Sequence, residues 1–348
     1  MKLAVIFGGK SSEHDVSIVS GTSVISNLDK NKYEIYPIYI SEDGLFYKYT
    51  KNIEDIKILK VGDKINELES IPNIIEYLKN IDVIFPVLHG LYGEDGTIQG
   101  LFELIGKPYV GCKVLASSLC MDKIYAKILF ERAGINTARS LYLKKYENNY
   151  KYIDNKFNEY ILTENEVCDK VIEKLKLPVF IKPSRQGSSV GVNKAKTKEE
   201  LIKYLNEAFN YDSKVLIEEA IIGREVECAV LGNDDLIVSP VGEVLSAEEF
   251  YTFSSKYQNS ASRTVIPANI DEKIMNNIKD LAKKTFIACD CSGLSRIDFF
   301  IENDTNRIIL NEINTLPGFT EISMYPKLIN SLGISYSELL DKLIELAK

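Results

Sequence analysis

The residues Arg-Ile-Asp-Phe-Phe-Ile at positions 296–301 and Ile-Ile-Leu-Asn-Glu-Ile-Asn at positions 308–314 decide the fold of the C-terminal part of this chain. Apolar residues alternate with other residues along the first stretch, which is the period of a strand with one buried face. A polar turn at 302–306 separates the two stretches. The sequence therefore predicts a β-hairpin.

One face of this predicted hairpin carries polar side chains. A tight turn would place Asp298 opposite Leu310 and one diagonal step from Glu312, with Asn314 on the same face. These oxygen donors, close to Arg296, are of the kind that hold Mg²⁺. A solvated acidic hairpin is the alternative interpretation, because short motifs are weak signals.

Length and composition indicate a globular protein of two or three domains. The chain has 348 residues, of which 45% are hydrophobic and 26% charged, and a formal net charge of −8. That charge gives no overall attraction for nucleic acid or anionic membranes. The apolar start reads as a first strand rather than a signal peptide, and no apolar run is long enough to span a bilayer. We expect a cytoplasmic location, with neither nucleic acid nor membrane as partner.

The six cysteines show no Cys-x-x-Cys spacing, and we expect buried, reduced thiols. They are Cys112, Cys120, Cys168, Cys228, Cys289 and Cys291. The Cys-Asp-Cys sequence at 289–291 has no second cysteine pair or nearby histidine to complete a zinc site.

Residues 1–111 alternate strands with helices, which predicts an open, largely parallel sheet. The strands are expected at 3–7, 35–40 and 83–88, and the helices at 16–28 and 71–78. The two histidines, His14 and His89, each follow a strand, where open α/β sheets bind ligands.

Two loops of this region are candidate ligand contacts. The first is the glycine turn at 8–17, which enters a helix. Either Ser12 caps this helix with Asp15 closing a capping box, or Glu13 faces a cationic group of a ligand. The second, at 89–97, contains three glycines within seven residues, which favours a loop that approaches a ligand closely.

The stretch 178–191 predicts a phosphate-binding loop between two strands. Lys182 ends the first strand, Gly187 and Gly191 allow backbone N–H groups to approach phosphate, and Ser188 and Ser189 add hydroxyl donors. The loop lacks the spacing of a P-loop and a following helix.

The remaining segments have simpler interpretations. Residues 144–174 are rich in Tyr, Asn and Lys and look like an exposed insertion. Glu218 and Glu219 follow a strand and suit the hydroxyl and amine donors of a nucleoside. Residues 248–263 suit a lid over a site. Helices are expected at 122–132, 271–286 and 336–346.

Taken together, five motifs resemble those of the D-alanine–D-alanine ligases, members of the ATP-grasp superfamily. They are Gly-Gly-Lys-Ser-Ser-Glu-His at 8–14, His-Gly-x-x-Gly-Glu-Asp-Gly at 89–96, Lys-Pro-Ser-Arg-Gln-Gly-Ser-Ser-Val-Gly at 182–191, Arg-Ile-Asp at 296–298 and Glu-Ile-Asn-Thr-Leu-Pro-Gly at 312–318. They occur in the family's order, and only 144–174 looks unmatched.

The resemblance implies a fold of mixed α/β and α+β class, an ATP-grasp fold preceded by an N-terminal open parallel-sheet domain. The implied domains are an N-terminal substrate domain at 1–111, a central ATP-grasp subdomain with the phosphate loop at 112–217, and a C-terminal subdomain with lid and metal site at 218–348.

The resemblance also implies residue roles. Glu13 would hold the ammonium of the first D-alanine, joined by hydrogen bonds to Ser188 and Tyr257. Arg296 and the backbone of Gly318 would surround the oxyanion. The remaining substrate contacts would come from His89 and, at the second D-alanine, from Ser323 and Met324.

ATP would lie between the central and C-terminal domains, with two Mg²⁺ ions, in place of which the site would also accept Mn²⁺. The phosphates would meet Lys123, Lys182, Ser188 and Ser189, under a lid carrying Lys256. The nucleoside would meet Glu218, Glu219, Ile221 and Glu225, and the metal ions would be held by Asp298, Glu312 and Asn314.

The implied activity is ATP-dependent ligation of two D-alanines, through a D-alanyl phosphate, for peptidoglycan precursor synthesis. The family also implies a homodimer formed through the N-terminal domain. Sibling ligases use D-serine or D-lactate as second substrate, and variants often carry Arg after the serine at 323. The sequence Ser-Met-Tyr-Pro at 323–326 looks like the D-alanine-specific pattern. A non-catalytic nucleotide sensor is the alternative of another class, which the intact Arg296 and metal-site residues disfavour.

Overall fold

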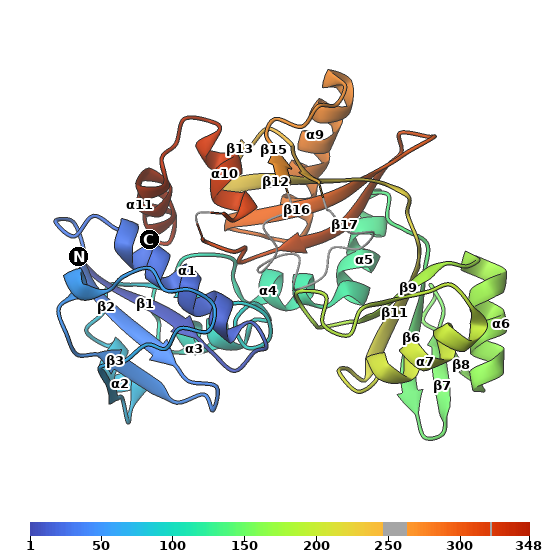
Figure 1. Cartoon of the computed structure of the whole chain (residues 1–348), viewed down its shortest axis with the longest axis horizontal. Helices are drawn as coiled ribbons and strands as arrows, with labels where there is room; N and C mark the ends of the chain where they lie inside the picture. Colours follow the sequence, from blue (N-terminus) through green and yellow to red (C-terminus); the bar gives the residue numbers. More distant parts are fainter. Residues whose placement is uncertain (246–262, 321) are drawn as a thin grey trace.

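The structure is a computed structural model that describes residues 1–245, 263–320 and 322–348. It contains three β-sheets, formed in turn by the N-terminal, central and C-terminal parts of the chain (Figure 1). Most of the predicted lid, including Lys256 and Tyr257, lies outside the described residues. The predicted domain boundaries stay predictions.

The N-terminal sheet has the strand order β4-β3-β2-β1-β5. The expected parallel core is present, because β1 pairs in parallel with both β2 and β5. The short antiparallel strands β3 and β4 extend one edge and were not predicted. The elements are β1 (Lys2–Gly8), α1 (His14–Asn27), β2 (Glu34–Ile40), β3 (Phe46–Tyr49), η1 (Ile53–Asp55), β4 (Leu68–Ser70), α2 (Ile74–Leu78), β5 (Val83–Val87) and α3 (Thr97–Leu104).

The central sheet has the order β10-β9-β11-β6-β7-β8 and is antiparallel throughout. Figure 1 shows it on the side of the molecule away from the N-terminal sheet. The elements of this part are α4 (Val114–Met121), α5 (Lys123–Arg132), β6 (Ser140–Tyr146), β7 (Asn149–Ile153), β8 (Glu159–Leu162), α6 (Glu164–Leu175), β9 (Val179–Pro183), β10 (Asn193–Ala195), α7 (Lys198–Ala208) and β11 (Lys214–Glu219).

The prediction of an exposed insertion at 144–174 is wrong. This segment supplies β7, β8 and α6, and its apolar residues enter the core of the central sheet. Tyr150 and Tyr152 are buried, whereas Asn149 and Lys151 beside them are only partly buried, as in a strand with one buried face. The helix starts at a capping box formed by Thr163 and Glu166. The polar composition therefore belongs to the outer face of regular structure.

The third sheet has the order β15-β14-β12-β16-β17, with β13 paired to β12. Its antiparallel pair β16–β17 is the predicted hairpin. The helices expected at 122–132, 271–286 and 336–346 appear as α5, α9 and α11, whereas α10 was not predicted. The elements are β12 (Gly223–Gly232), β13 (Ile237–Val238), β14 (Gly242–Leu245), β15 (Arg263–Val265), α9 (Glu272–Ala288), β16 (Gly293–Glu302), β17 (Ile308–Asn314), α10 (Met324–Asn330) and α11 (Tyr336–Leu346).

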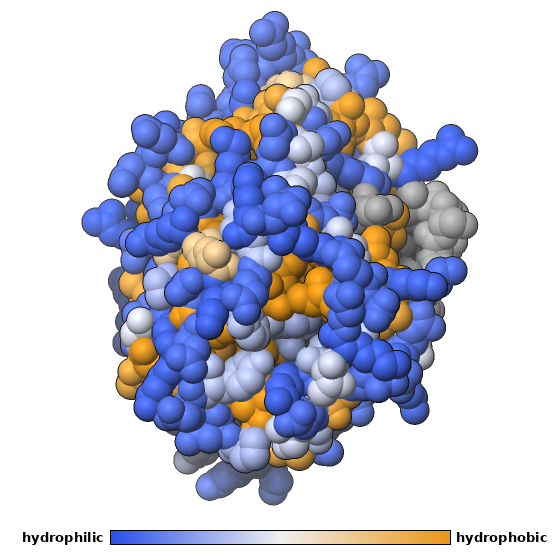
Figure 2. Space-filling view, turned by 90° about the vertical axis from the view of Figure 1, so that its left-hand side faces the viewer, coloured by the Kyte–Doolittle hydropathy of each residue, from blue (hydrophilic) through white to orange (hydrophobic). Residues whose placement is uncertain are grey.

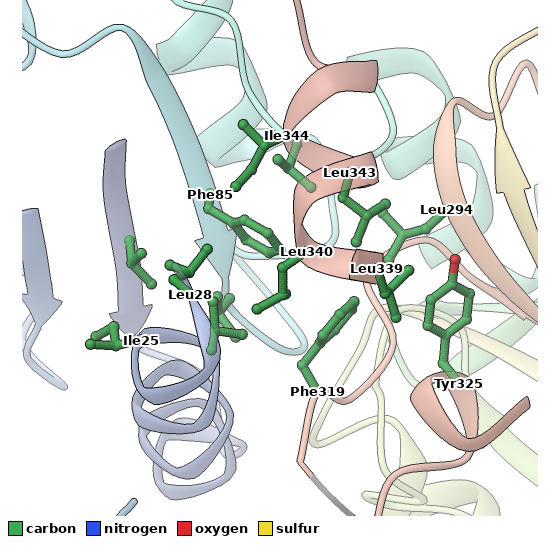
Figure 3. Close-up of a cluster of buried hydrophobic side chains, with 14 of the residues drawn as sticks. Ile25, Leu28, Phe85, Leu294, Phe319, Tyr325, Leu339, Leu340, Leu343 and Ile344 are labelled. Carbon is green, nitrogen blue, oxygen red and sulfur yellow. The ribbon is translucent and has the colours of Figure 1, made fainter. Parts of the chain in front are cut away.

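Helix α11 joins the C-terminal end of the chain to the N-terminal part. A capping box formed by Ser335 and Glu338 starts it. Its apolar face, including Leu340, belongs to the same buried cluster as Ile25 of α1 and Phe85 of β5 (Figure 3). Burying a leucine side chain contributes about 1.5–3 kcal/mol, so this shared core holds the N-terminal sheet beside the third sheet.

The molecular face on the N-terminal side is mostly hydrophilic, with hydrophobic areas scattered across it (Figure 2). Within the described ranges, no helix combines the length and the apolar character that crossing a membrane requires.

Candidate active site

A cavity of about 590 Å³ is lined by residues from all three parts of the chain. Every predicted site residue that the structure describes lines this cavity, although their individual roles stay predictions. These residues are Glu13, His89, Lys123, Lys182, Ser188, Ser189, Glu218, Glu219, Ile221, Glu225, Arg296, Asp298, Glu312, Asn314, Gly318, Ser323 and Met324.

The β16–β17 hairpin presents its polar residues to the cavity in a register that differs from the predicted one. Asp298 lies opposite Glu312, not Leu310. The register shifts between Asp298 and Phe299, so Asn311 is an extra residue on β17. Such a bulge re-aims side chains at an active site. Here it brings the two carboxylates directly across from one another.

Arg296 is held by two carboxylates. Its Nε and Nη2 atoms donate to the two Asp298 oxygens at 2.8 and 2.7 Å. Its Nε atom is also 2.8 Å from Oε2 of Glu227, which lies beside Asp298 on strand β12. Burial lowers the pKa of Arg296, but the charges of Asp298 and Glu227 outweigh it and raise that pKa well above its usual value. The guanidinium is therefore a fixed positive charge facing the cavity.

The predicted metal ligands have suitable chemistry. Asp298 and Glu312 face each other on adjacent strands, and Nδ2 of Asn314 donates to Asp298 at 3.1 Å. Two carboxylates and an amide oxygen are hard donors that suit Mg²⁺. Among the residues the structure describes, no group of three or more His, Cys, Asp or Glu side chains is arranged to hold a metal ion. The metal role stays a prediction that rests on a donor set with only two carboxylates.

Two lysines converge on Glu218 at the opposite wall. Lys127 of α5 and Lys182 of β9 lie 2.5 and 2.7 Å from its two oxygens. Burial raises the pKa of this carboxyl, but the two ammonium charges outweigh that effect and lower its pKa to about 2. Lys182 also approaches Asn311, the extra residue of the bulge, at 3.4 Å. The lysine is thereby fixed between the central and C-terminal sheets.

Asp122 positions both Lys123 and the glycine-serine loop, which we define as residues 184–192 between β9 and β10. Its carboxylate caps the first turn of α5, which begins at Lys123. The same carboxylate accepts a hydrogen bond from the Ser184 hydroxyl and forms an ion pair with Lys214. The Lys123 ammonium in turn donates to the backbone oxygen of Gln186 at 2.6 Å. One buried carboxylate therefore couples a helix start to the loop that follows β9.

The glycine-serine loop reaches across to the N-terminal part. Ser188 Oγ donates to Glu13 Oε2 at 2.5 Å, and Ser188 and Ser189 both have positive φ angles. A positive φ is uncommon outside glycine and marks a strained segment that the surroundings hold in place. The capping box of Ser12 and Asp15 is absent, because Glu13 is the N-cap of α1 and makes no capping hydrogen bond. Glu13 instead faces the cavity.

His89 is buried and joins two segments instead of projecting freely into the cavity. One ring nitrogen lies 3.3 Å from the Leu316 oxygen and the other 3.0 Å from Ser20 Oγ. Burial lowers the pKa of His89 to about 4, so the ring is neutral at pH 7. This contact ties the loop after β17 to the N-terminal domain.

The loop after β17 is also fixed at its other end. The backbone N–H of Thr320 donates to Ser323 Oγ at 3.1 Å, directly before α10. A Cβ atom at Gly318 would lie only 2.9 Å from the same Ser323 oxygen, so a side chain here would displace the Ser323 hydroxyl. Tyr336 of α11 donates to the Phe319 oxygen at 2.6 Å. Helix α11 therefore supports the backbone beside Gly318.

Sequence reasoning missed several charged residues of the site. Glu227 lies two residues after Glu225 on β12, and period-2 alternation could have placed it on the same face. Glu94 lies within the motif at 89–96, but the sequence analysis assigned it no role. Burial and then the charge of Glu13 raise the pKa of Glu94 to about 8. Glu94 therefore holds a proton at neutral pH, and no local sequence signal could have indicated that.

Known proteins are similar to this chain over most of its length. The chain matches two family models, described as the D-ala D-ala ligase N-terminus over residues 2–112 and the D-ala D-ala ligase C-terminus over residues 133–345. The chain belongs to the D-alanine–D-alanine ligase family. It is thus a ligase with an ATP-grasp fold. The second match includes 144–174, so the prediction that this segment is unmatched is also wrong.

Individual relatives cover nearly the full length of the chain. The D-alanine–D-alanine ligase B of Clostridium tetani is 50% identical over 100% of this chain and 93% of that protein. A D-alanine–D-alanine ligase of Caldicellulosiruptor bescii is 46% identical over 100% and 95%.

Solved structures are similar over the same length. The VanG D-Ala:D-Ser ligase of Enterococcus faecalis has a TM-score of 0.84 at 39% identity, covering 100% of this chain and 99% of that one. The D-alanine–D-alanine ligase of Bacillus anthracis complexed with ATP has a TM-score of 0.75 at 32% identity, covering 100% and 97%.

The low pKa of Glu218 leads to a prediction about acid stability. Its folded-state pKa of about 2 lies below the ordinary value of 4.5, so the ionised carboxylate stabilises the fold above about pH 4.5. That stabilisation is lost as the pH falls toward about 2. The difference in unfolding free energy between the natural protein and Glu218→Gln should shrink over this window. Urea unfolding at several pH values measures it, and a difference that does not change with pH would contradict the assignment.

Proposed function

We propose that this chain joins two D-alanine molecules to D-alanyl-D-alanine, using ATP and passing through D-alanyl phosphate. The proposal rests on one observation: a single cavity is lined by the glycine-serine loop, by two lysines and by the polar edge of the β16–β17 hairpin. The lysines are Lys123 and Lys182, and the edge carries Arg296, Asp298 and Glu312. A carboxylate is a poor acyl donor, so its activation needs a phosphoryl group and cations to offset the crowded charge.

The first D-alanine would bind at Glu13. Its ammonium pairs with the Glu13 carboxylate, which the Ser188 hydroxyl already orients. Burial and the nearby charge of Glu13 raise the pKa of Glu94. In its protonated form, Glu94 adds no second negative charge beside the substrate. Tyr257, outside the described residues, would add a further hydrogen bond. This arrangement leaves the D-alanine carboxylate free to face the nucleotide.

ATP would lie along the wall formed by the central sheet. Lys123 and Lys182 offset the charge of its phosphates, and the backbone N–H groups and hydroxyls of Ser188 and Ser189 close over them. The adenine would meet Glu218, Glu219 and Ile221, the ribose would meet Glu225, and Lys256 of the lid would close the site. The ATP-complexed relative from Bacillus anthracis supports nucleotide binding in this fold.

Asp298, Glu312 and Asn314 would hold two Mg²⁺ ions. Their oxygen donors would also accept Mn²⁺. A bound divalent ion supplies charge neutralisation during phosphoryl transfer. The chain's own part is to hold these three side chains on adjacent strands. Asp298 is also paired with Arg296, so its buried carboxylate does not lack a positive partner.

The amine of the second D-alanine would then attack the acyl phosphate. The oxyanion of the tetrahedral intermediate forms near the Arg296 guanidinium and the Gly318 backbone, and one such donor is worth roughly 10²–10³ in rate. Ser323 and Met324 would contact the second substrate, and His89 would act through its support of the Leu316 backbone. Exclusion of water protects the acyl phosphate from hydrolysis.

A ligase for D-serine as second substrate is the alternative that a specific observation favours. The VanG D-Ala:D-Ser ligase is similar over the whole chain. We favour D-alanine, because the curated relatives that match at 42–50% identity are D-alanine–D-alanine ligases. In the cell we propose a cytoplasmic role in peptidoglycan precursor synthesis, as a homodimer without nucleic-acid or membrane partners.

A product assay tests the proposal. The protein is incubated with ATP and D-alanine alone, and then with equal amounts of D-serine or D-lactate added. We expect D-alanyl-D-alanine as the main product by mass spectrometry, and phosphate release only when D-alanine is present. A mixed product without D-alanyl-D-alanine would assign the chain to the sibling ligases. Absence of any D-alanine-dependent phosphate release would sink the proposal.

The metal ligands can be tested by conservative substitution. Asp298→Asn and Glu312→Gln keep the side-chain shape but remove a charge that binds the metal ion. Since a metal ion supplies several kcal/mol and each 1.36 kcal/mol is tenfold, turnover should fall at least about 100-fold with an unchanged circular dichroism spectrum. Glu302→Gln, at the end of β16 in the same hairpin, is the matched control and should keep its activity. Near-normal turnover of both variants at saturating Mg²⁺ would exclude the metal role.

A further inference from the structure

The glycine-serine loop is bound at its base by the turn at 211–214, which leads from α7 into β11. The backbone N–H of Ser184, the first residue of the loop, donates to the Lys214 oxygen at 3.0 Å. The next residue, Arg185, binds Asp212 of the same turn. Neither Arg185 nor Asp212 has a part in the ligation proposed above, and neither lines the cavity.

The contact between Arg185 and Asp212 is a two-point ion pair with a third bond from the backbone. The Arg185 Nη2 atom donates to Asp212 Oδ1 at 2.7 Å, and its Nε atom donates to Oδ2 at 3.1 Å. The backbone N–H of Arg185 also donates to Oδ2, at 2.9 Å. Two parallel bonds between a guanidinium and a carboxylate fix direction as well as distance. The pair therefore sets both the position and the orientation of the loop's second residue.

The Asp212 carboxylate belongs to the interior, whereas its partner is half-exposed. The side chain of Asp212 is 1% exposed and that of Arg185 is 48% exposed. Burial raises the pKa of Asp212, but hydrogen bonds from Arg185 and from the backbone of Lys214 outweigh it and lower this pKa below its usual value. Asp212 is thus a fixed negative charge in the body of the central part, and the mobile end of the pair is the loop residue.

The tip of the loop has little freedom to correct a misplaced base. Three residues after Arg185, the Ser188 hydroxyl donates to Glu13. A Cβ atom on Gly187 would lie only 2.5 Å from Glu13 Oε1, so the tip approaches this carboxylate as closely as a glycine allows. Ser188 and Ser189 have positive φ angles, a strained conformation that the surroundings must hold. A shift at the base would therefore reach both serines.

We propose that Arg185 and Asp212 are positioning residues, whose ion pair places the glycine-serine loop over the phosphates of ATP. The pair acts through the loop, because its side chains do not line the cavity. This inference rests on the proposed function, since it takes the loop to be the phosphate-binding element. It differs from a purely structural role, in which the pair would stabilise the central part without favouring any portion of the nucleotide.

Arg185→Gln tests the pair, because it removes the cation and keeps the backbone hydrogen bond. A misplacement of about 1 Å can cost about 100-fold in rate, so kcat/KM for ATP should fall about tenfold to 100-fold. Loss of one hydrogen bond from the loop to a charged phosphate corresponds to about tenfold in affinity. We expect that loss for ATP with Mg²⁺, and an unchanged affinity for adenosine, which has no phosphate. Isothermal titration calorimetry without D-alanine measures both affinities.

Three further variants separate positioning from folding. Arg185→Lys keeps a charge but not the two-point geometry, so it should recover part of the ATP affinity. Since the two side chains act as one unit, Arg185→Gln combined with Asp212→Asn should lose no more ATP affinity than the weaker of the two single variants. The control Lys198→Gln removes an ion pair with Asp169 between α7 and α6, and it should bind ATP as the natural protein does.

Several results would overturn the proposal. They are an unchanged ATP affinity in Arg185→Gln, equal losses for ATP and adenosine, or losses that multiply in the double variant. If Arg185→Gln does not fold, Arg185→Lys provides the same comparison of the two ligands. Loss of ATP affinity in a protein that makes no dipeptide would refute the proposed function and leave the positioning role standing. Dipeptide synthesis with an unaffected Arg185→Gln would do the reverse, and a natural protein that binds no ATP would overturn both.

Discussion

The ion pair between Arg296 and Asp298 is the interaction on which the site depends. Asp298 is buried and Arg296 is half-buried, and a buried charge without a partner costs several kcal/mol, so each side chain fixes the other. Glu227 on the neighbouring strand completes the pairing. The same pairing orients the Arg296 guanidinium toward the cavity and fixes the position of Asp298, one of the predicted metal ligands. Apolar residues on the other face, among them Ile297 and Phe299, anchor the strand in the core.

The second constraint is the support of this edge by the N-terminal part of the chain. The loop beside Gly318 is bound through Leu316 to His89 and through Phe319 to Tyr336 of α11. Because α11 shares a core with α1 and β5, the backbone next to the predicted oxyanion is held by packing far from the cavity. We infer that the N-terminal part of this chain supports the geometry of this edge, in addition to supplying Glu13, the predicted contact of the first substrate.

Local patterns in the sequence predicted much of this fold, and long-range pairing explains what they missed. Alternation predicted the hairpin, but the bulge at Asn311 leaves no mark on that alternation, so the expected register was wrong. Composition suggested an exposed insertion, although Tyr150 and Tyr152 already carried the period of a strand. Motifs predicted residues that line the cavity. The position of Glu227 and the raised pKa of Glu94 depend on neighbouring segments of the chain, which no motif indicated.

In the proposed reaction, the site activates the first D-alanine as an acyl phosphate. The most direct test uses D-alanine labelled with oxygen-18 in its carboxylate, with the released phosphate analysed by mass spectrometry. Attack of a carboxylate oxygen on the γ-phosphate predicts one labelled oxygen in each phosphate released during dipeptide formation. Unlabelled phosphate released together with dipeptide would contradict the account.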